Sequence, residues 1–273
     1  MAKFEVTQVK VPFPEAGDLH LRIRVGACRL KVRPGPDEIP TPRDAEGIGI
    51  GVESWVIGTY QHPSGVLPAR VEEEGGTVTI TQERTLADIG GIFRGAPRFE
   101  LALGKAKPYM LTLEVGASES SFDLGGLPVT RLIAKQGAGK ADFDFSAPNP
   151  QPMSLLDVDA GAVGMNMKNL ANANFAEMAI HGGAAVYKFD FGGALQRDAH
   201  VRIVTGMSSV VISVPASTAA KITTESTLSG MDVGDGFMKK EGAFWTEAAL
   251  AGKTPVLTIY ASISLGSLLI RTT

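Results

Sequence analysis

Hydrophobic and polar residues alternate along much of this chain, and the alternation recurs in copies that each contain a glycine at the same place. Small or apolar residues stand five, three and one positions before the glycine, and mostly apolar residues stand four and six positions after it. Alternation with a period of two is the pattern of a β-strand with one buried face. The glycines of the copies are Gly26, Gly116, Gly137, Gly161, Gly183 and Gly206.

The spacing of the copies predicts how they pack. Regular copies follow one another at roughly 21–24 residues, which is typical of a solenoid whose repeats stack on their neighbours. The glycines fit the corners, where a positive φ or a close backbone approach excludes a side chain. Stacking predicts three continuous apolar rows: Leu111, Leu132, Leu156, Met178 and Val201; Leu113, Ala134, Val158, Ile180 and Ile203; and Phe122, Phe143, Met167, Phe189 and Ile212.

The regularity of the pattern divides the chain. Residues 1–105 are interpreted as a less regular β-rich module and residues 106–273 as the solenoid domain, packed together as one continuous unit. The Asn-rich segment 169–178 is interpreted as a polar corner. Residues 215–256 lack the pattern, so we expect them to interrupt the repeat, with a long loop or hairpin over residues 230–242. A closing coil follows, with Leu257, Ile259, Ala261, Leu268 and Ile270 in its inward positions.

Residues 111–124, followed by residues 127–132 and the run Gly137-Ala138-Gly139, resemble the toast-rack family. That family is related to the C-terminal domain of LiaF-like cell-wall-antibiotic-response proteins and to adhesin-like domains. Residues 99–103 resemble the end of its N-terminal module. The resemblance implies an all-β, right-handed β-helix without enzymatic activity, in systems that sense cell-envelope stress in bacteria. It also implies fusion to a membrane segment, which this sequence does not show, so a role at the membrane would need a partner.

Composition narrows the range of partners. Of 273 residues, 26 are basic and 29 acidic, so no field of one sign attracts nucleic acid or an anionic membrane. The single cysteine, Cys28, excludes an internal disulfide framework and fits a reducing compartment. The sequence shows no signal-peptide core, no lipid-attachment cysteine and no apolar run of about 20 residues. We therefore expect a cytoplasmic protein that does not insert into a membrane and reaches one only through a partner.

One outward row, seven positions after the template glycine, carries Asp123, Asp144, Lys168 and Asp190. In a stack that keeps register, Lys168 lies between Asp144 and Asp190. A strip that binds a cation or a polar ligand is one interpretation of this row. We favour a solvated ladder of compensating charges, because opposite charges on neighbouring strands are ordinary.

Aromatic residues gather in the segment that interrupts the repeat. Phe237, Phe244 and Trp245 either cap the open end of the solenoid or form a patch that binds a partner. Of these two interpretations, we favour the cap.

Motifs for catalysis and for cofactors do not assemble. Residues 137–140 lack the glycine spacing and the Ser or Thr of a phosphate loop, and the four histidines show no metal-ligand spacing. Cys28 is assigned an outward position beside Arg29, which would lower the pKa of its thiol modestly. We therefore predict no cofactor, no metal and no enzymatic activity, since a solenoid enzyme would need a convergent cluster of charged residues.

These observations favour a noncatalytic interaction scaffold that binds a protein partner, or a second copy of itself, in a cell-envelope stress pathway. A cell-surface or carbohydrate-binding, adhesin-like protein is the alternative, with shallow grooves lined by Asn, Asp and aromatic side chains. The absence of an export signal in the sequence favours the scaffold.

Overall fold

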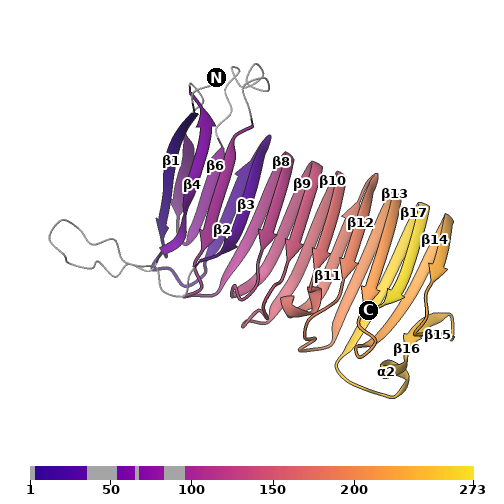
Figure 1. Cartoon of the computed structure of the whole chain (residues 1–273). Helices are drawn as coiled ribbons and strands as arrows, with labels where there is room; N and C mark the ends of the chain where they lie inside the picture. The colour runs from indigo at the N-terminus through magenta and orange to yellow at the C-terminus, as the bar shows by residue number, and fades with distance from the viewer. Residues whose placement is uncertain (1–3, 36–53, 65–67, 83–95) are drawn as a thin grey trace.

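Strands dominate the computed structural model, which describes residues 4–35, 54–64, 68–82 and 96–273 (Figure 1). The strands of the N-terminal part are β1 (Phe4–Pro12), β2 (His20–Val25), β3 (Cys28–Pro34), β4 (Ser54–Pro63), β5 (Ala69–Glu74), β6 (Thr77–Gln82) and β7 (Arg98–Leu103). They are followed by β8 (Tyr109–Asp123), β9 (Val129–Asp144), β10 (Met153–Lys168), β11 (Phe175–Gly182), β12 (Ala185–Asp190), β13 (Ala199–Val214), β14 (Ala219–Val233), β15 (Phe237–Lys240), β16 (Ala243–Thr246) and β17 (Val256–Thr272). The short helical elements are η1 (Leu170–Ala173) and α2 (Glu247–Leu250).

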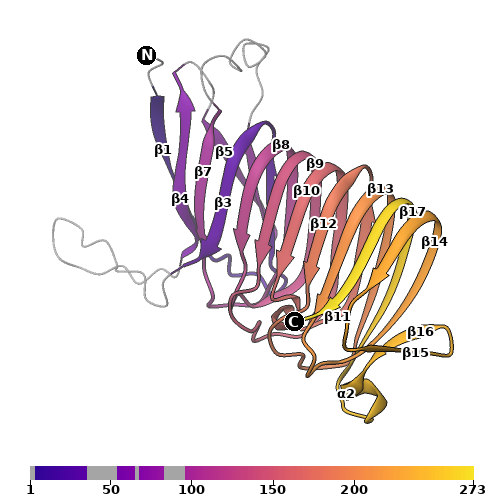
Figure 2. The same ribbon diagram turned by 45° about the vertical axis from the view of Figure 1, so that its right-hand side comes forward.

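Each long strand turns a corner near the template position and so contributes to two faces of a stack. We call the part before the corner the first face and the part after it the second face. β8 pairs in parallel with β9, and β9 with β10. β10 then pairs with β11 on the first face and with β12 on the second, and both pair with β13. Figures 1 and 2 show these coils side by side along an elongated molecule.

The three predicted apolar rows are confirmed by the strand register. Leu132 pairs with Leu111 on one side and Leu156 on the other, and the row continues through Met178 to Val201. The other two rows keep the same register. Every member of the three rows is buried. The coils therefore share one continuous core, as expected for repeats that cannot bury their apolar faces alone.

The order of the coils in space departs from their order in the chain at both ends. β2 and β3 stack on β8, and on their other side they pair with β6 and β7. β17 lies between β13 and β14 and pairs in parallel with both. The predicted inward residues of β17, including Leu257 and Ile259, are buried. The coil is nevertheless not the closing one, because β14 lies beyond it.

The prediction that residues 215–256 interrupt the repeat is wrong, since β14 is a complete parallel rung within that segment. The sequence pattern missed it because no glycine marks its corner: the register sets Gly206 opposite Ser264, and Ser264 opposite Thr227. The loop or hairpin expected over residues 230–242 is displaced along the chain. Residues 230–233 belong to β14, and β15 pairs antiparallel with β16, which lies beyond residue 242.

Antiparallel strands cover the N-terminal end of the ladder and, at the C-terminal end, its first face. At the N-terminal end, β5 pairs with β6, and β4 pairs with β7 and with β1. At the C-terminal end, β16 pairs with the first-face part of β14, and β15 pairs with β16. No helix in the described part of the chain is long and apolar enough to cross a membrane.

Asparagines hold the corner that contains η1. The polar corner predicted for residues 169–178 is shorter than expected, because strand β11 begins at Phe175, and it is largely buried. Asn169 and Asn174 flank η1 in the left-handed conformation. Asn172 Nδ2 donates to the carbonyl oxygen of Phe145 at 2.9 Å, and Asn149 Nδ2 donates to the carbonyl oxygen of Val129 at 2.8 Å. The corners of successive coils are thus tied together by buried side-chain amides, which satisfy carbonyls that no strand partner reaches.

Candidate functional site

An open groove of about 790 Å³ follows the corner of the coils on the first face. We call it the glycine groove, because Gly26, Gly116, Gly137 and Gly161 lie along it. Its other lining residues are Arg24, Val25, Thr81, Gln82, Glu114, Val115, Lys135, Gln136, Asp159, Ala160 and His181. The groove therefore runs across several coils, whose strands hold its side chains at fixed spacing.

Close approach between coils explains the glycines of this groove. A Cβ added to Gly116 would lie 3.2 Å from the carbonyl oxygen of Gly26, and one added to Gly183 would lie 3.0 Å from that of Gly161. A Cβ on Gly161 would overlap the carbonyl oxygen of Gly137. None of these three residues has a positive φ. Of the two roles that the sequence left open for the corner glycines, close backbone approach is the one that applies at these three positions.

Charged side chains of alternating sign line the groove two positions before the first four template glycines, and His181 occupies this position before the fifth. The register places Arg24 beside Glu114, and Glu114 beside Lys135. Asp159 follows Lys135, and His181 follows Asp159. Neighbouring strands are about 4.8 Å apart, so each charge faces one of opposite sign on the next coil. We call these five residues the charge ladder.

The charge ladder is only partly paired. Arg24 Nε lies 2.6 Å from Glu114 Oε2. Lys135, Asp159 and His181 are exposed, and within the described residues their side chains have no hydrogen-bond or ion-pair partner. This half of the ladder therefore presents ionisable groups that a bound molecule can reach.

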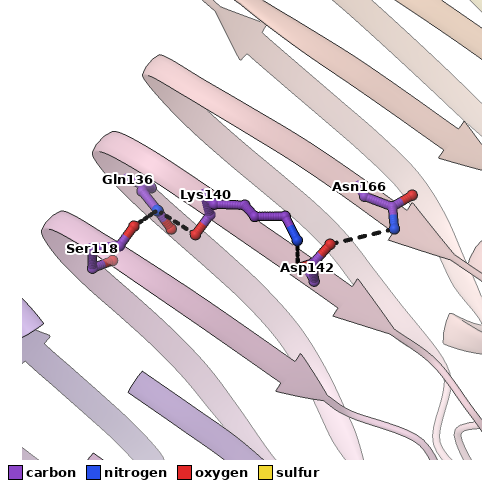
Figure 3. Close-up of polar contacts among 5 residues, drawn as sticks. All are labelled: Ser118, Gln136, Lys140, Asp142 and Asn166. Atoms are coloured by element: carbon purple, nitrogen blue, oxygen red, sulfur yellow. Dashed lines mark hydrogen bonds and ion pairs between the residues drawn. The ribbon is translucent and has the colours of Figure 1, made fainter. Parts of the chain in front are cut away.

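A buried amide supports the groove from the inside (Figure 3). Gln136 occupies an inward position just before the corner and is 6% exposed. Its Nε2 donates to the carbonyl oxygens of Ser118 at 3.3 Å and Lys140 at 3.1 Å. A neutral amide at this position satisfies carbonyls that the turning backbone leaves without a strand partner. The corner below Lys135 is thereby fixed to the adjacent coil.

Some of the charges on the second face are paired with one another. Lys140 Nζ lies 2.7 Å from Asp142 Oδ2, and this hydrogen bond raises the pKa of Lys140. Asn166 Nδ2 donates to Asp142 Oδ1 at 3.4 Å (Figure 3). Nearer the N-terminal end, Arg29 lies 3.1 Å from Glu119. Other charged groups of this face, such as Lys168 and Lys188, are exposed and make no side-chain hydrogen bond or ion pair within the described residues.

The predicted polar strip is assembled in part. Asp123, Asp144 and Lys168 follow one another in register. The two carboxylates, however, bind the turns of neighbouring coils. Asp123 accepts a hydrogen bond from Ser146 Oγ, and Asp144 accepts one from Asn169 Nδ2. Asp190 accepts from the amide of Gly192 and pairs with Ser213. These acceptors are thus occupied in holding loops.

The three aromatic residues of the C-terminal hairpin have different surroundings. Phe244 is 8% exposed and belongs to the apolar core cluster. Phe237 is half-buried and packs against that cluster. Trp245 lies on the outer side, with Lys221 Nζ 4.9 Å from its ring centre and its Nε1 donating to the carbonyl oxygen of Lys240. The first two cover the last coil, while the indole faces partly outward.

Two further expectations concern reactive or metal-binding groups. The outward position assigned to Cys28 is wrong, because the corner shifts the alternation by one residue and leaves the side chain 3% exposed. Burial raises the pKa of its thiol to about 12, opposite to the predicted direction. Within the described residues, no three His, Cys, Asp or Glu side chains cluster closely enough to hold a metal ion.

Sequence reasoning overlooked the charge ladder, although the signal was present in the template. Reading the residue two positions before the first five template glycines gives Arg24, Glu114, Lys135, Asp159 and His181 in order. The alternation of sign is visible there once the copies are aligned.

The fold and the groove together define a class: an all-β, solenoid-like protein that exposes a charged groove on rigid coils. Residues 51–155 match the family model described as the N-terminal domain of toast_rack, DUF2154. The matched segment is less than half of the chain, so this part of the protein is similar to the toast-rack N-terminal domain.

A solved structure that shares the fold is a "putative cell adhesion protein" from Clostridium sporogenes. It has a TM-score of 0.52 and 14% sequence identity, over 99% of this chain and 100% of that one. A "putative adhesin" from Bacteroides fragilis has a TM-score of 0.38 and 10% identity, over 99% and 97% of the two chains. No curated protein matches the sequence. At these identities the first likeness shows a common fold alone.

Proposed function

We propose that this protein is a noncatalytic scaffold that binds a protein partner through the glycine groove. The observation that carries the proposal is the free half of the charge ladder, formed by Lys135, Asp159 and His181 over an open groove. A partner segment with an acidic group facing Lys135 and a basic group facing Asp159 would complement both. Such complementarity gives specificity and steers association.

The arrangement of the groove supports binding rather than chemistry. A catalytic site brings a nucleophile or a general base into contact with the group that orients it. The side chains of the groove instead follow one another along the strands at the spacing of the ladder, each beside a group of opposite charge. The similarity of residues 51–155 to the toast-rack N-terminal domain and the fold shared with the Clostridium protein also favour a noncatalytic role.

The proposal extends to the place of this binding in the cell. We place it in a bacterial cell-envelope stress pathway, with the protein in the cytoplasm and brought to the membrane by its partner. The resemblance to LiaF-like proteins supports this placement. A right-handed winding of the coils belongs to the same proposal, because crossovers between parallel strands are right-handed in nearly all proteins.

The test compares two charge-swapped variants that keep the net charge. Lys135→Glu with Asp159→Lys inverts the free half of the ladder, while Glu177→Lys with Lys188→Glu changes exposed residues outside the groove. Wild-type and variant proteins are immobilised and exposed to cytosolic and envelope fractions of the native cell. We expect a partner that the wild type and the second variant retain and the first variant loses. Equal retention by all three would refute the groove as the binding site.

A carbohydrate-binding, adhesin-like function is the second candidate, favoured by the fold shared with the Clostridium protein named for cell adhesion. Binding of the wild type to an array of bacterial and host glycans would support it. Loss of that binding in the Lys135→Glu, Asp159→Lys variant would place the glycan in the same groove.

A further inference from the structure

Within the described residues, the first face ends at each end of the molecule in a strand with one free edge. At the N-terminal end this strand is β5, which pairs with β6 alone among the described strands. At the C-terminal end it is β15, whose pairing within the described chain is with β16. A free edge presents unpaired N–H and C=O groups, which are a template for another strand.

The two edge strands carry opposite charges. Glu72, Glu73 and Glu74 are exposed on β5, where Arg70 pairs with Glu72. Lys239 and Lys240 are exposed on β15. Like charges oppose the pairing of β5 with β5 or of β15 with β15, as edge charges commonly do. The same charges favour the pairing of β5 with β15.

We propose that copies of this chain associate head to tail, with β15 of one copy pairing antiparallel to β5 of the next. The direction follows from the fold. β5 runs against β6, whereas β15 runs along β14, because two antiparallel pairings separate β15 from β14. Since β6 and β14 run parallel through the intervening coils, β5 and β15 run opposite to each other when copies follow one another along the stack.

The strand register brings the oppositely charged residues of the two edges to the same positions along the strands. Glu73 and Lys239 lie at one such position on the first face, which we call a level, and Glu72 and Lys240 lie at the adjacent level. An in-line copy would therefore set Glu73 opposite Lys239 and Glu72 opposite Lys240, each pair on one side of the sheet. The level of Glu73 is traced through the pairings Val78, Leu21, Leu111, Leu132, Leu156, Met178, Val201, Ile259, Ile222, Phe244 and Lys239.

Exposed apolar side chains accompany these edges. Val71 on β5 is 42% exposed, and Met238 on β15 is 51% exposed. On the second face, which has no strand beyond β14 within the described residues, Met231 is 45% exposed. A second copy at this end would remove part of this surface from water. Because the contact joins two different surfaces, it is heterologous and extends into a filament unless its rotation closes a ring.

Sedimentation velocity over a range of concentrations tests the proposal. The wild type is expected to exceed the mass of one chain, 28.7 kDa, as concentration rises, and to associate less at high salt because exposed charges are screened. Glu72→Lys with Glu73→Lys, or Lys239→Glu with Lys240→Glu, should each weaken association roughly tenfold or more, since attraction at two pairs becomes repulsion. The Glu177→Lys, Lys188→Glu variant is the control and should associate like the wild type.

Mixing the two end variants gives the decisive result. Each variant carries ends of one sign and should stay a single chain, while an equimolar mixture should associate again, because every joint then brings opposite charges together. Melting curves of the separate variants establish that both are folded. The proposal is overturned by a wild type that remains a single chain up to about 1 mM, by end variants that associate like the wild type, or by a mixture that does not associate.

Cross-linking reports the register directly. Glu73→Cys in one protein and Lys239→Cys in another should form a disulfide-linked pair on mixing under oxidising conditions. Val71→Cys with Lys239→Cys is the mismatched control and should form it more slowly, and equal rates would refute this register. The groove proposal does not involve these residues, so failure here leaves it standing.

Discussion

Gly161 stands where two neighbouring coils come closest. The glycines of the template all mark corners, but they differ in what a side chain would meet. A Cβ on Gly161 would overlap the carbonyl oxygen of Gly137, whereas a Cβ on Gly206 would lie 3.8 Å from that of Gly183, an ordinary contact. The same sequence signal thus covers positions with different steric requirements.

Alanine substitutions should separate these two positions. Gly161→Ala forces adjacent backbones apart and should lower the free energy of unfolding by about 1–3 kcal/mol. Gly206→Ala should be neutral or raise it by up to about 1 kcal/mol, because alanine loses less backbone entropy than glycine in a strand. Urea unfolding followed by circular dichroism measures both. Equal losses would show that the corner, rather than the local contact, requires glycine.

The buried thiol of Cys28 should make stability depend on alkaline pH. Burial raises its pKa from 9.0 to about 12 in the folded protein. Below pH 9 the thiol is protonated in both the folded and the unfolded state, so its contribution to the free energy of unfolding is fully present. Above it the unfolded thiol ionises first, so the free energy of unfolding falls as pH rises toward 12, by about 1 kcal/mol at pH 10. Urea titrations at pH 8 and pH 10 should show this extra loss in the wild type relative to Cys28→Ala.

The hairpin of β15 and β16 closes half of the last coil. It covers the first-face part of β14, where Phe244 pairs with Ile222, and it leaves Met231 of the second-face part 45% exposed. Phe244 and Trp245 are adjacent in sequence, yet alternation places one in the core and the other outside. The cap that the sequence suggested therefore divides into residues with unequal contributions.

Truncating the two aromatic residues should show this inequality. Phe244→Ala removes a buried ring and should cost about 3 kcal/mol of unfolding free energy. Trp245→Ala loses one hydrogen bond and the contact with Lys221, and should cost about 1–2 kcal/mol. Thermal or urea unfolding of the two variants provides the comparison. A larger loss at Trp245 would mean that the indole, rather than the phenyl ring, closes the coil.

Much of the molecule could be predicted from its sequence, and the exceptions have physical reasons. The rows through Leu132 and Phe143 were predictable because each coil repeats the same inward positions. β14 was not, since its corner lacks glycine and Thr224 takes the place that Ile203 and Ala261 fill in the preceding coils. The insertion of β17 between β13 and β14 depends on pairings between residues far apart in the sequence. Because the copies resemble one another, their sequences do not show in which order they stack. The charge ladder could have been predicted from the template, but its free half required the contacts.

The insertion of β17 gives the C-terminal end an unusual dependence on the last residues of the chain. Ending the protein at Val233 removes β15, β16, α2 and β17 together. β13 then loses its neighbour on both faces, and β14 loses its parallel partner, so Ile203 and Ile212 are uncovered. Because coils interact chiefly with their neighbours, we expect the midpoint measured by circular dichroism to fall markedly. Trp55 is buried at the other end of the stack. The melting midpoint reported by its fluorescence should fall less. An unchanged melting curve would mean that β14 can pack directly on β13 when β17 is absent. The fit between adjacent coils would then not require β17 between them.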